Sequence, residues 1–240
     1  MWRLRVKAIL FCGLLVALYN DWLLGPFLNH SLSTSVSMIS ELSAQTQPYH
    51  WVFQTLDISA GVLTLAALPL LWHFLHKQPI NHWPVLFVAV AAIGADSIVD
   101  ALLPITCAPS TDPTCNLATT HSLLTQAHMA ESTLIGIVTF VTPLMWWLFN
   151  RSKQYFLSRP SLWFVLLQVF IGVGILLTRS LHYHVVGAFQ RSYQLGIGVW
   201  IISIMYAILV TTSKRPSFKI RIRRKFKQVP LPTLALFYDE

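Results

Sequence analysis

The chain has 240 residues, of which 55% are hydrophobic and only 11% are charged, and its mean hydropathy is +0.58. A soluble globular domain carries about 25% charged residues, so this composition excludes an ordinary soluble protein and indicates a surface that mostly faces lipid. The formal net charge of +8 does not indicate a nucleic-acid partner, because eight of the 17 Lys and Arg residues lie between Lys214 and Lys227, directly after the last apolar segment. A basic cluster in that place is typical of a helix end held against anionic lipid headgroups.

Six apolar segments are long enough to cross a bilayer, for which a helix needs about 20 residues because its backbone polar groups must be satisfied internally. Pro69 and Pro143 are expected to kink the second and the fourth segments. The first segment lacks a small-x-small cleavage pattern, which favours an uncleaved helix over a signal peptide. The sequence therefore predicts an all-α integral membrane protein, with a six-helix membrane domain over 1–212 and a basic tail over 213–240. The expected transmembrane helices are 8–28, 52–75, 83–104, 129–150, 161–179 and 193–212.

The distribution of Lys and Arg residues sets the orientation, because cytoplasmic loops are enriched in them. Fifteen of the 17 fall at the amino end, in the connections 76–82 and 151–160, and in the tail. Only Arg179 and Arg191 fall on the other side. We therefore expect both termini in the cytoplasm. The outer connections are then 29–51, 105–128 and 180–192.

Cys107 and Cys115 fall in the same outer connection, in the run Cys-Ala-Pro-Ser-Thr-Asp-Pro-Thr-Cys. Disulfides persist on the oxidising side of a membrane, which favours a bond between these two residues. Two free thiols, or a cysteine pair serving as metal ligands, are the alternatives.

Acidic residues and histidines gather on the predicted outer side, which holds seven of the nine acids and six of the nine histidines. Asp96 and Asp100 are four residues apart and project from one face of the third span. Asp96 lies about two turns inside the outer end of that span, where a carboxylate is costly unless it is paired, protonated or hydrated. Acids at such a depth are candidates for function, so both are candidate catalytic residues. Structural pairing of Asp96 with Arg179 is the alternative.

The segment before the fourth span carries polar residues at helical spacing. If the segment is helical, one stripe consists of His121, Thr125, His128 and Ser132, with Glu131 beside it. His128 then lies near the depth of Asp100 and is a third candidate catalytic residue. The alternative is an amphipathic approach helix whose histidines face water.

His182 and His184 form a His-x-His pair after the fifth span. This pair chelates a metal only when it is extended, because on a helix the two rings point in roughly opposite directions. Arg179 and Arg191 lie on the side that the charge rule keeps poor in basic residues, which indicates a specific role in pairing with Asp96 or Asp57 or in holding an anionic headgroup. The candidate metal ligands are His121, His128, His182 and His184, with zinc as the ion considered.

Four stretches resemble the multipass bacterial and archaeal membrane proteins of domain-of-unknown-function family 998. They are Ile-Ser-Glu-Leu-Ser-Ala over 39–44 with the following Trp51, the Asp100 to Ser110 run with Asp112 and Cys115, the segment from His121 to Ser132, and Gly-Ala-Phe-Gln-Arg over 187–191. The resemblance implies a six-helix fold and a prokaryotic plasma membrane, but no activity. It directs attention to Ser40, Glu41, Asp100, His128, Gln190 and Arg191, and among these we expect Glu41, Gln190 and Arg191, with Arg179, to bind a ligand.

Two classes of function fit these residues. The first is a non-catalytic accessory or sensor protein whose outer polar site binds a lipid or lipid-linked ligand; a transporter with Asp96 as proton carrier is a variant of it. The second is a metal-dependent hydrolase that acts on a lipid at the outer leaflet, since three histidines and an acid can hold zinc and activate water. Ceramidase-like membrane hydrolases use a similar residue set, but this sequence lacks their seventh span and the His pair one turn apart in their last helix.

Overall fold

The computed structural model describes residues 2–76, 82–115, 122–151, 158–180 and 185–213. These residues form helices and irregular connections, with no strand among them. The elements are α1 (Trp2–Tyr19), η1 (Asp21–Leu24), α2 (Gly25–Leu28), η2 (Ile39–Glu41), α3 (His50–Ala66), α4 (Leu68–Leu75), α5 (Trp83–Leu102), α6 (Leu123–Asn150), α7 (Ser158–Ser180) and α8 (Val186–Ser213).

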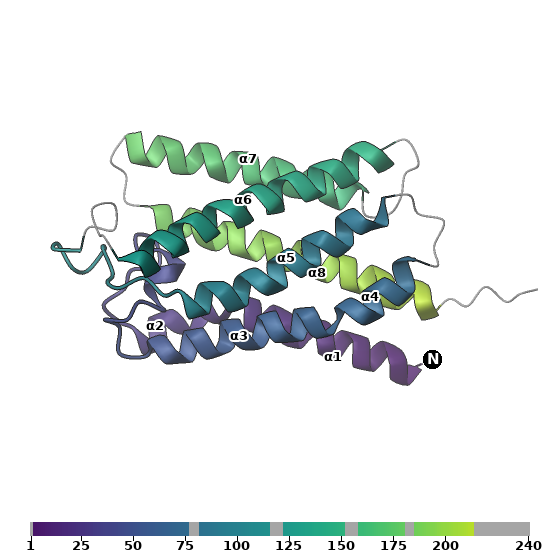
Figure 1. The fold of residues 1–240 in the computed structure, drawn as a ribbon, viewed down its shortest axis with the longest axis horizontal. Coiled ribbons are helices and arrows are strands. Elements are labelled where there is room, and N and C mark those ends of the chain that lie inside the picture. The colour runs from purple at the N-terminus through teal and green to yellow at the C-terminus, as the bar shows by residue number, and fades with distance from the viewer. Residues whose placement is uncertain (1, 77–81, 116–121, 152–157, 181–184, 214–240) are drawn as a thin grey trace, which may run out of the picture.

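The long helices lie roughly along one direction (Figure 1), and their contacts close a ring. Helix α1 packs against α3 and α8, and the ring continues through α3–α5, α5–α6, α6–α7 and α7–α8 contacts. The residues 29–49 and 103–115 lie at one end of the ring, which we name the loop end. The start of α1 and the end of α8 lie at the opposite end. The chain therefore runs up and down through the ring, with each long helix beside its neighbours in sequence.

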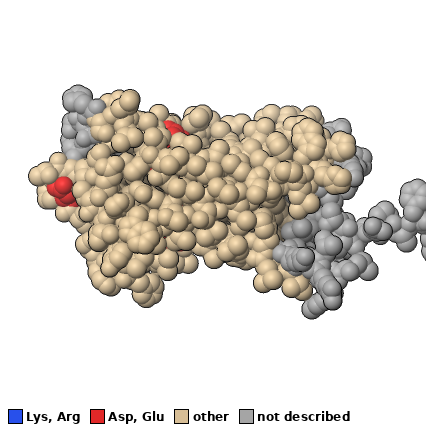
Figure 2. Space-filling view, turned by 60° about the horizontal axis from the view of Figure 1, so that its bottom comes forward, with Lys and Arg blue, Asp and Glu red and all other residues tan. Residues whose placement is uncertain are grey.

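The sides of the ring are apolar, as the composition requires. Leu10, Leu134, Trp163 and Phe170 expose between 63% and 71% of their surface. Figure 2 shows one side of the molecule as a broad surface of uncharged residues with small acidic patches. Among the described residues, four helical segments are long and apolar enough to cross a membrane, or five if the bent pair Ile9–Tyr19 and Asp21–Leu28 is one span. The structure thus supports an all-helical protein with four or five candidate spans.

The first expected span, 8–28, is not one straight helix. Helix α1 ends at Tyr19, and the following helical turns are inclined to it by 58°. The break is at Asn20, whose backbone leaves the helical conformation (φ −118°, ψ 32°) and whose Nδ2 donates a hydrogen bond of 2.8 Å to the Val16 carbonyl oxygen. The bend turns Asp21 inward, where it is 6% exposed.

The other helices differ from the expected spans mainly at their ends. The second span divides at Ala67, two residues before Pro69, whereas α6 runs through Pro143 as one helix. Helices α6 and α8 begin six and seven residues earlier than expected, at Leu123 and Val186. Polar residues can extend a helix beyond the apolar stretch that hydropathy detects, so Gln190 and Arg191 belong to α8 and not to a loop.

Helices α3 and α5 approach closely at two glycines. A Cβ atom on Gly61 would lie 2.5 Å from the Gly94 carbonyl oxygen and 2.6 Å from Ile98 Cγ1. Small residues permit such backbone contact between membrane helices. The approach brings Asp57, one turn before Gly61, to the side of α5 that carries Asp96.

We predict that Gly61→Ala destabilises the fold by about 1–3 kcal/mol, because the added methyl group meets backbone atoms that cannot move aside. Gly172→Ala is the matched control, since nothing lies within 4 Å of a Cβ atom built there. The control should be neutral or slightly stabilising, as alanine favours a helix over glycine. Thermal unfolding of both variants in detergent measures the difference, and equal unfolding temperatures would refute the close approach.

Candidate functional site

A cavity of about 160 Å³ lies inside the ring at its loop end. Its walls come from η1, η2, α3, α5, α6 and α8, so every long helix except α1 and α7 contributes. The lining residues are Asp21, Ile39, Ser40, Asp57, Asp96, Ser97, Asp100, Glu131, Ser132, Ile135, Gln190, Tyr193, Gln194 and Ile197. The cavity is therefore formed between the helices of the ring, and it is partly open.

Five of these lining residues are carboxylic acids, and none of the described lining residues is Lys or Arg. Asp21, Asp57 and Asp100 lie close enough to repel one another when they are ionised. Removing several carboxylates from water without a compensating charge costs several kcal/mol for each. The cavity therefore has the electrostatics of a site for a cation.

Several carboxylate oxygens in the cavity have no hydrogen-bond donor. They are Asp21 Oδ2, Asp96 Oδ1 and both oxygens of Glu131, each buried and without a partner among the described residues. Buried polar atoms in native proteins nearly always have a protein, water or ion partner. The side chains thus leave acceptor oxygens available for a group that the protein chain does not supply.

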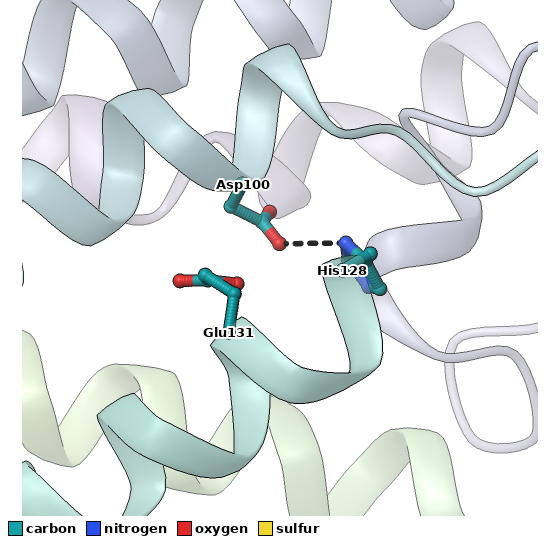
Figure 3. A group of neighbouring side chains, drawn as sticks. All are labelled: Asp100, His128 and Glu131. Carbon is teal, nitrogen blue, oxygen red and sulfur yellow. Dashed lines mark ion pairs between the residues drawn. The ribbon is translucent and has the colours of Figure 1, made fainter. Parts of the chain in front are cut away.

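Asp100, His128 and Glu131 form the tightest cluster of the site, and Figure 3 shows them facing one another across the gap between α5 and α6. His128 Nδ1 lies 3.1 Å from Asp100 Oδ1. The His128 side chain is 5% exposed and that of Asp100 is 28% exposed. His128 and Glu131 are three residues apart on α6, so one helix face presents both to Asp100.

This cluster fits a divalent metal ion. One possible ligand atom from each of the three residues lies within 4.8 Å of the other two. Zinc binds nitrogen and oxygen ligands at about 2.0–2.2 Å in tetrahedral geometry, which places its ligand atoms about 3.3–3.6 Å apart. A pair of ligand atoms at the 4.8 Å limit would therefore have to approach by about 1 Å, a shift that side-chain rotation can supply. Three protein ligands leave further coordination positions open for water or a substrate.

The residues 29–49 cover the cavity, and we name them the covering loop. Within it, Ile39 and Ser40 line the cavity. Gln190 Oε1 accepts a hydrogen bond of 2.7 Å from the Ile39 N–H. Gln190 therefore fixes the covering loop to α8 directly above the cavity.

Glu41 joins the covering loop to the connection after α5. It is 1% exposed, and its Oε1 accepts a hydrogen bond of 2.8 Å from the Met38 N–H. Its Oε2 accepts bonds from the Ser110 N–H at 3.0 Å and from Ser110 Oγ at 2.5 Å. Hydrogen bonds to an ionised group are stronger than those between neutral groups. Glu41 therefore holds the covering loop against the segment that carries Ser110.

Hydrogen bonds of Arg191 hold the covering loop against α8. Its guanidinium donates to the carbonyl oxygens of Thr34 and Ser37, at 2.6 and 2.7 Å. Gly187 makes this possible, because a Cβ atom there would lie 2.2 Å from the Ser37 oxygen. The hydrogen bonds of Arg191 thus go to the covering loop and not to Asp96 or Asp57, with which pairing was considered.

Cys107 and Cys115 are joined as a disulfide, with their Cα atoms 5.9 Å apart. The bond closes the segment that carries Ser110 and Asp112. Hydrogen bonds from the Thr114 side chain and N–H hold the pKa of the exposed Asp112 carboxyl below its usual value. The disulfide therefore limits the motion of the segment on which Glu41 depends.

The predicted site residues divide into three groups. Asp96, Asp100 and His128 come together at the cavity, and Gln190 lines it. Glu41 and Arg191 hold the covering loop. The remaining predictions are not tested: His121, His182 and His184 lie outside the described residues, and so does the side chain of Arg179 in the last turn of α7.

Sequence reasoning missed Asp21, Asp57 and Glu131 as members of the site. Asp57 lies within the second span and Asp21 within the expected first span, so the rule that intramembrane acids are functional candidates applies to both. Glu131 is three residues after His128, and a carboxylate and an imidazole at that spacing share a helix face. The burial of Asp21 had no sequence signal, because it depends on the bend after α1.

The sequence matches the family described as protein of unknown function (DUF998) over residues 10–207. The chain belongs to this family. The matched range includes all five carboxylates of the cavity, His128 and the residues that hold the covering loop. Comparisons with curated proteins and with solved structures gave no match. Membership of the DUF998 family thus carries no activity, and the site has to be interpreted from its own geometry.

We predict that Glu41→Ala lowers the free energy of unfolding by about 1–3 kcal/mol, because it removes the acceptor of three part-buried hydrogen bonds from Met38 and Ser110. Ser110→Ala is the milder comparison, at about 1–2 kcal/mol, since the Ser110 N–H remains. Thermal unfolding in detergent and the rate of proteolysis within residues 29–49 measure both effects. Wild-type stability in the Glu41 variant would contradict the role assigned to this carboxylate.

Proposed function

We propose that this DUF998 protein spans the prokaryotic plasma membrane six times, with both termini in the cytoplasm. The first span is then α1 with the bent segment after it, and α3 with α4 forms the second. Helix α8 completes the set: it has 28 residues, packs between α1 and α7, and buries Trp200, Ile201 and Ile204 in the core. A span needs about 20 residues, so the length of α8 is sufficient.

The arrangement of the helix ends supports this orientation. The start of α1, the ends of α4 and α6 and the start of α7 lie at one end of the ring, opposite the loop end. The connections at that end contain most of the basic residues, which are typical of the cytoplasmic side. The cavity and the disulfide then lie on the outer side, and we propose that the basic tail, 214–240, binds anionic lipid headgroups of the inner leaflet.

This orientation predicts which single cysteines an impermeant maleimide labels in intact cells. Ser31→Cys, exposed in the covering loop, should be labelled from outside, whereas Arg151→Cys, exposed after α6, should be labelled only after the cells are permeabilised. Labelling of detergent-solubilised protein controls for reactivity of each thiol. The opposite pattern would reverse the topology.

We further propose that the cavity holds a divalent metal ion, with zinc as the first candidate, through Asp100, His128 and Glu131. The observation that carries this proposal is the convergence of the three ligand groups in a cavity whose carboxylate oxygens lack donors. Two carboxylates and one imidazole suit first-row ions such as Zn²⁺ and Mn²⁺. Asp21, Asp57 and Asp96 would add negative charge around the ion and strengthen its binding.

The ligand that we propose for this site is a lipid or lipid-linked molecule, whose polar group reaches the open positions on the metal. Partial exposure of Asp100 supports this, because the ion would be accessible from one side.

Hydrolysis of such a lipid is the second candidate function. Asp96 Oδ1, which has no hydrogen-bond partner among the described residues, favours hydrolysis. A free carboxylate in the cavity could accept a proton from the attacking water. Asp96→Asn tests it, since that variant should lose turnover of a lipid ester or amide and keep the metal.

We predict that protein purified in detergent binds zinc near one equivalent per chain. Asp100→Asn, His128→Ala and Glu131→Gln should each weaken zinc or manganese binding by about tenfold or more, because the first and third remove the negative charge of a carboxylate ligand and the second removes the imidazole nitrogen. Asp112→Asn is the matched control, since this exposed acid lies outside the cavity, and its metal affinity should equal that of the wild type. Metal analysis and titration provide the measurements. If folded wild-type protein bound no zinc or manganese, the proposed metal site would be refuted.

A further inference from the structure

We infer that a phospholipid of the outer leaflet enters the site sideways between α5 and α6, with one acyl chain in a groove on the lipid-facing side and its phosphate on the metal. This inference rests on the proposed metal site and orientation, and it specifies the ligand and its route. It does not require a reaction. The covering loop contributes Ile39 and Ser40 to the wall at the loop end, whereas a lipid of the bilayer reaches the protein from the side, where the groove lies.

The groove lies between α5 and α6 and has a volume of about 420 Å³. Its apolar walls come from small and branched side chains: Ala92, Ala95, Val99, Ala130, Leu134 and Val138. The stretches 92–99 and 130–138 rise by 1.5 Å per residue, so the groove runs about 10–12 Å along the helices. These dimensions suit a segment of an extended acyl chain.

The groove is continuous with the acidic cavity. Asp96, Glu131 and Ile135 line both of them. Glu131 is also one of the three residues proposed to hold the metal, so a molecule in the groove would have one end within reach of the ion. An isolated surface groove would have no such polar terminus.

The direction of the groove matches a lipid of the outer leaflet. Asp96 and Glu131 lie toward the loop end, because α5 ends at Leu102 and α6 begins at Leu123. Ala92 and Val138 lie deeper along the same helices. An amphiphile therefore fits with its polar group toward the outer surface and its chain toward the bilayer centre, which is the orientation of an outer-leaflet lipid.

The charge of the cavity with and without a bound metal determines which lipid headgroup can bind. Without a metal, the carboxylates of the cavity repel an anion, whereas a bound divalent ion with open positions attracts one. Phosphate oxygens are hard ligands for divalent cations. The headgroup should therefore bind only when the metal is present, and a lipid with the same chains but no phosphate should bind more weakly.

The test uses the full chain in phosphatidylcholine vesicles that contain a small fraction of phosphatidylglycerol with a photoactivatable diazirine in one acyl chain. Mass spectrometry measures the label on peptides from α5 and α6. A diacylglycerol with the same diazirine chain is the matched probe without phosphate. We expect the phosphatidylglycerol probe to label the groove at least several-fold more than the diacylglycerol in the presence of Zn²⁺ or Mn²⁺. A chelator should abolish this difference.

Ala95→Trp fills the groove without changing a metal ligand, and Leu134→Trp does so from α6. Both variants should lower the labelling several-fold, while their metal affinity stays that of the wild type. Ala17→Trp is the matched control, because Ala17 is also an exposed alanine, but on α1. Unchanged labelling in both groove variants would overturn the inference.

The outcomes separate this inference from the proposed function. Wild-type protein that binds no metal refutes the metal site itself. Protein that binds the metal but shows no difference between the two probes refutes the phospholipid only. Excess inorganic phosphate tests the source of the headgroup: we expect it to leave the groove labelling in place, because the acyl chain adds affinity that free phosphate lacks. Complete displacement would make free phosphate the ligand and overturn the lipid.

Discussion

The lipid environment of the ring sides determines where the charged groups can lie. Hydrocarbon offers no hydrogen-bond partner, so an acid within a membrane helix has to face the interior of the protein. Asp57, Asp96, Asp100 and Glu131 all follow this rule, and the bend after α1 adds Asp21 to the same space. The helix ring thus concentrates negative charge in one cavity, and this concentration is the feature that the metal, the headgroup and the route of entry depend on.

Two charged residues above the cavity, Arg191 and Glu41, make their hydrogen bonds to the covering loop and the segment after α5. The guanidinium of Arg191 binds two carbonyl oxygens of the covering loop, and Glu41 accepts bonds from the backbone and Ser110. These contacts use charge to position a loop and leave the cavity acids without a cation from the described residues. The covering loop, the Cys107–Cys115 segment and the start of α8 therefore act together as a cap over a site whose charge remains available.

Hydropathy and charge predicted the helical fold and brought Asp96, Asp100 and His128 to attention, because these signals are local in sequence. The bend after Tyr19 and the burial of Asp21 depend on the backbone conformation of Asn20 and on packing, which a hydropathy window does not detect. The structural roles of Glu41 and Arg191 could not be predicted from the sequence either, since they form hydrogen bonds with backbone groups up to 157 residues away. A charged residue can bind either a ligand or a loop of its own chain, and the folded structure is needed to distinguish the two.

Protonation is the other way to reduce the charge of the cavity, but protonation of a single acid is not a sufficient explanation. A protonated carboxyl group gains an O–H donor, which needs an acceptor when it is buried. Protonation of Glu131 would remove one charge, but it would leave Asp21, Asp57 and Asp100 close enough to repel one another when ionised. A divalent ion satisfies Glu131, Asp100 and His128 together. Asp96 and Glu131 line both the cavity and the groove, so an ion held by Glu131 would lie within reach of a molecule in the groove.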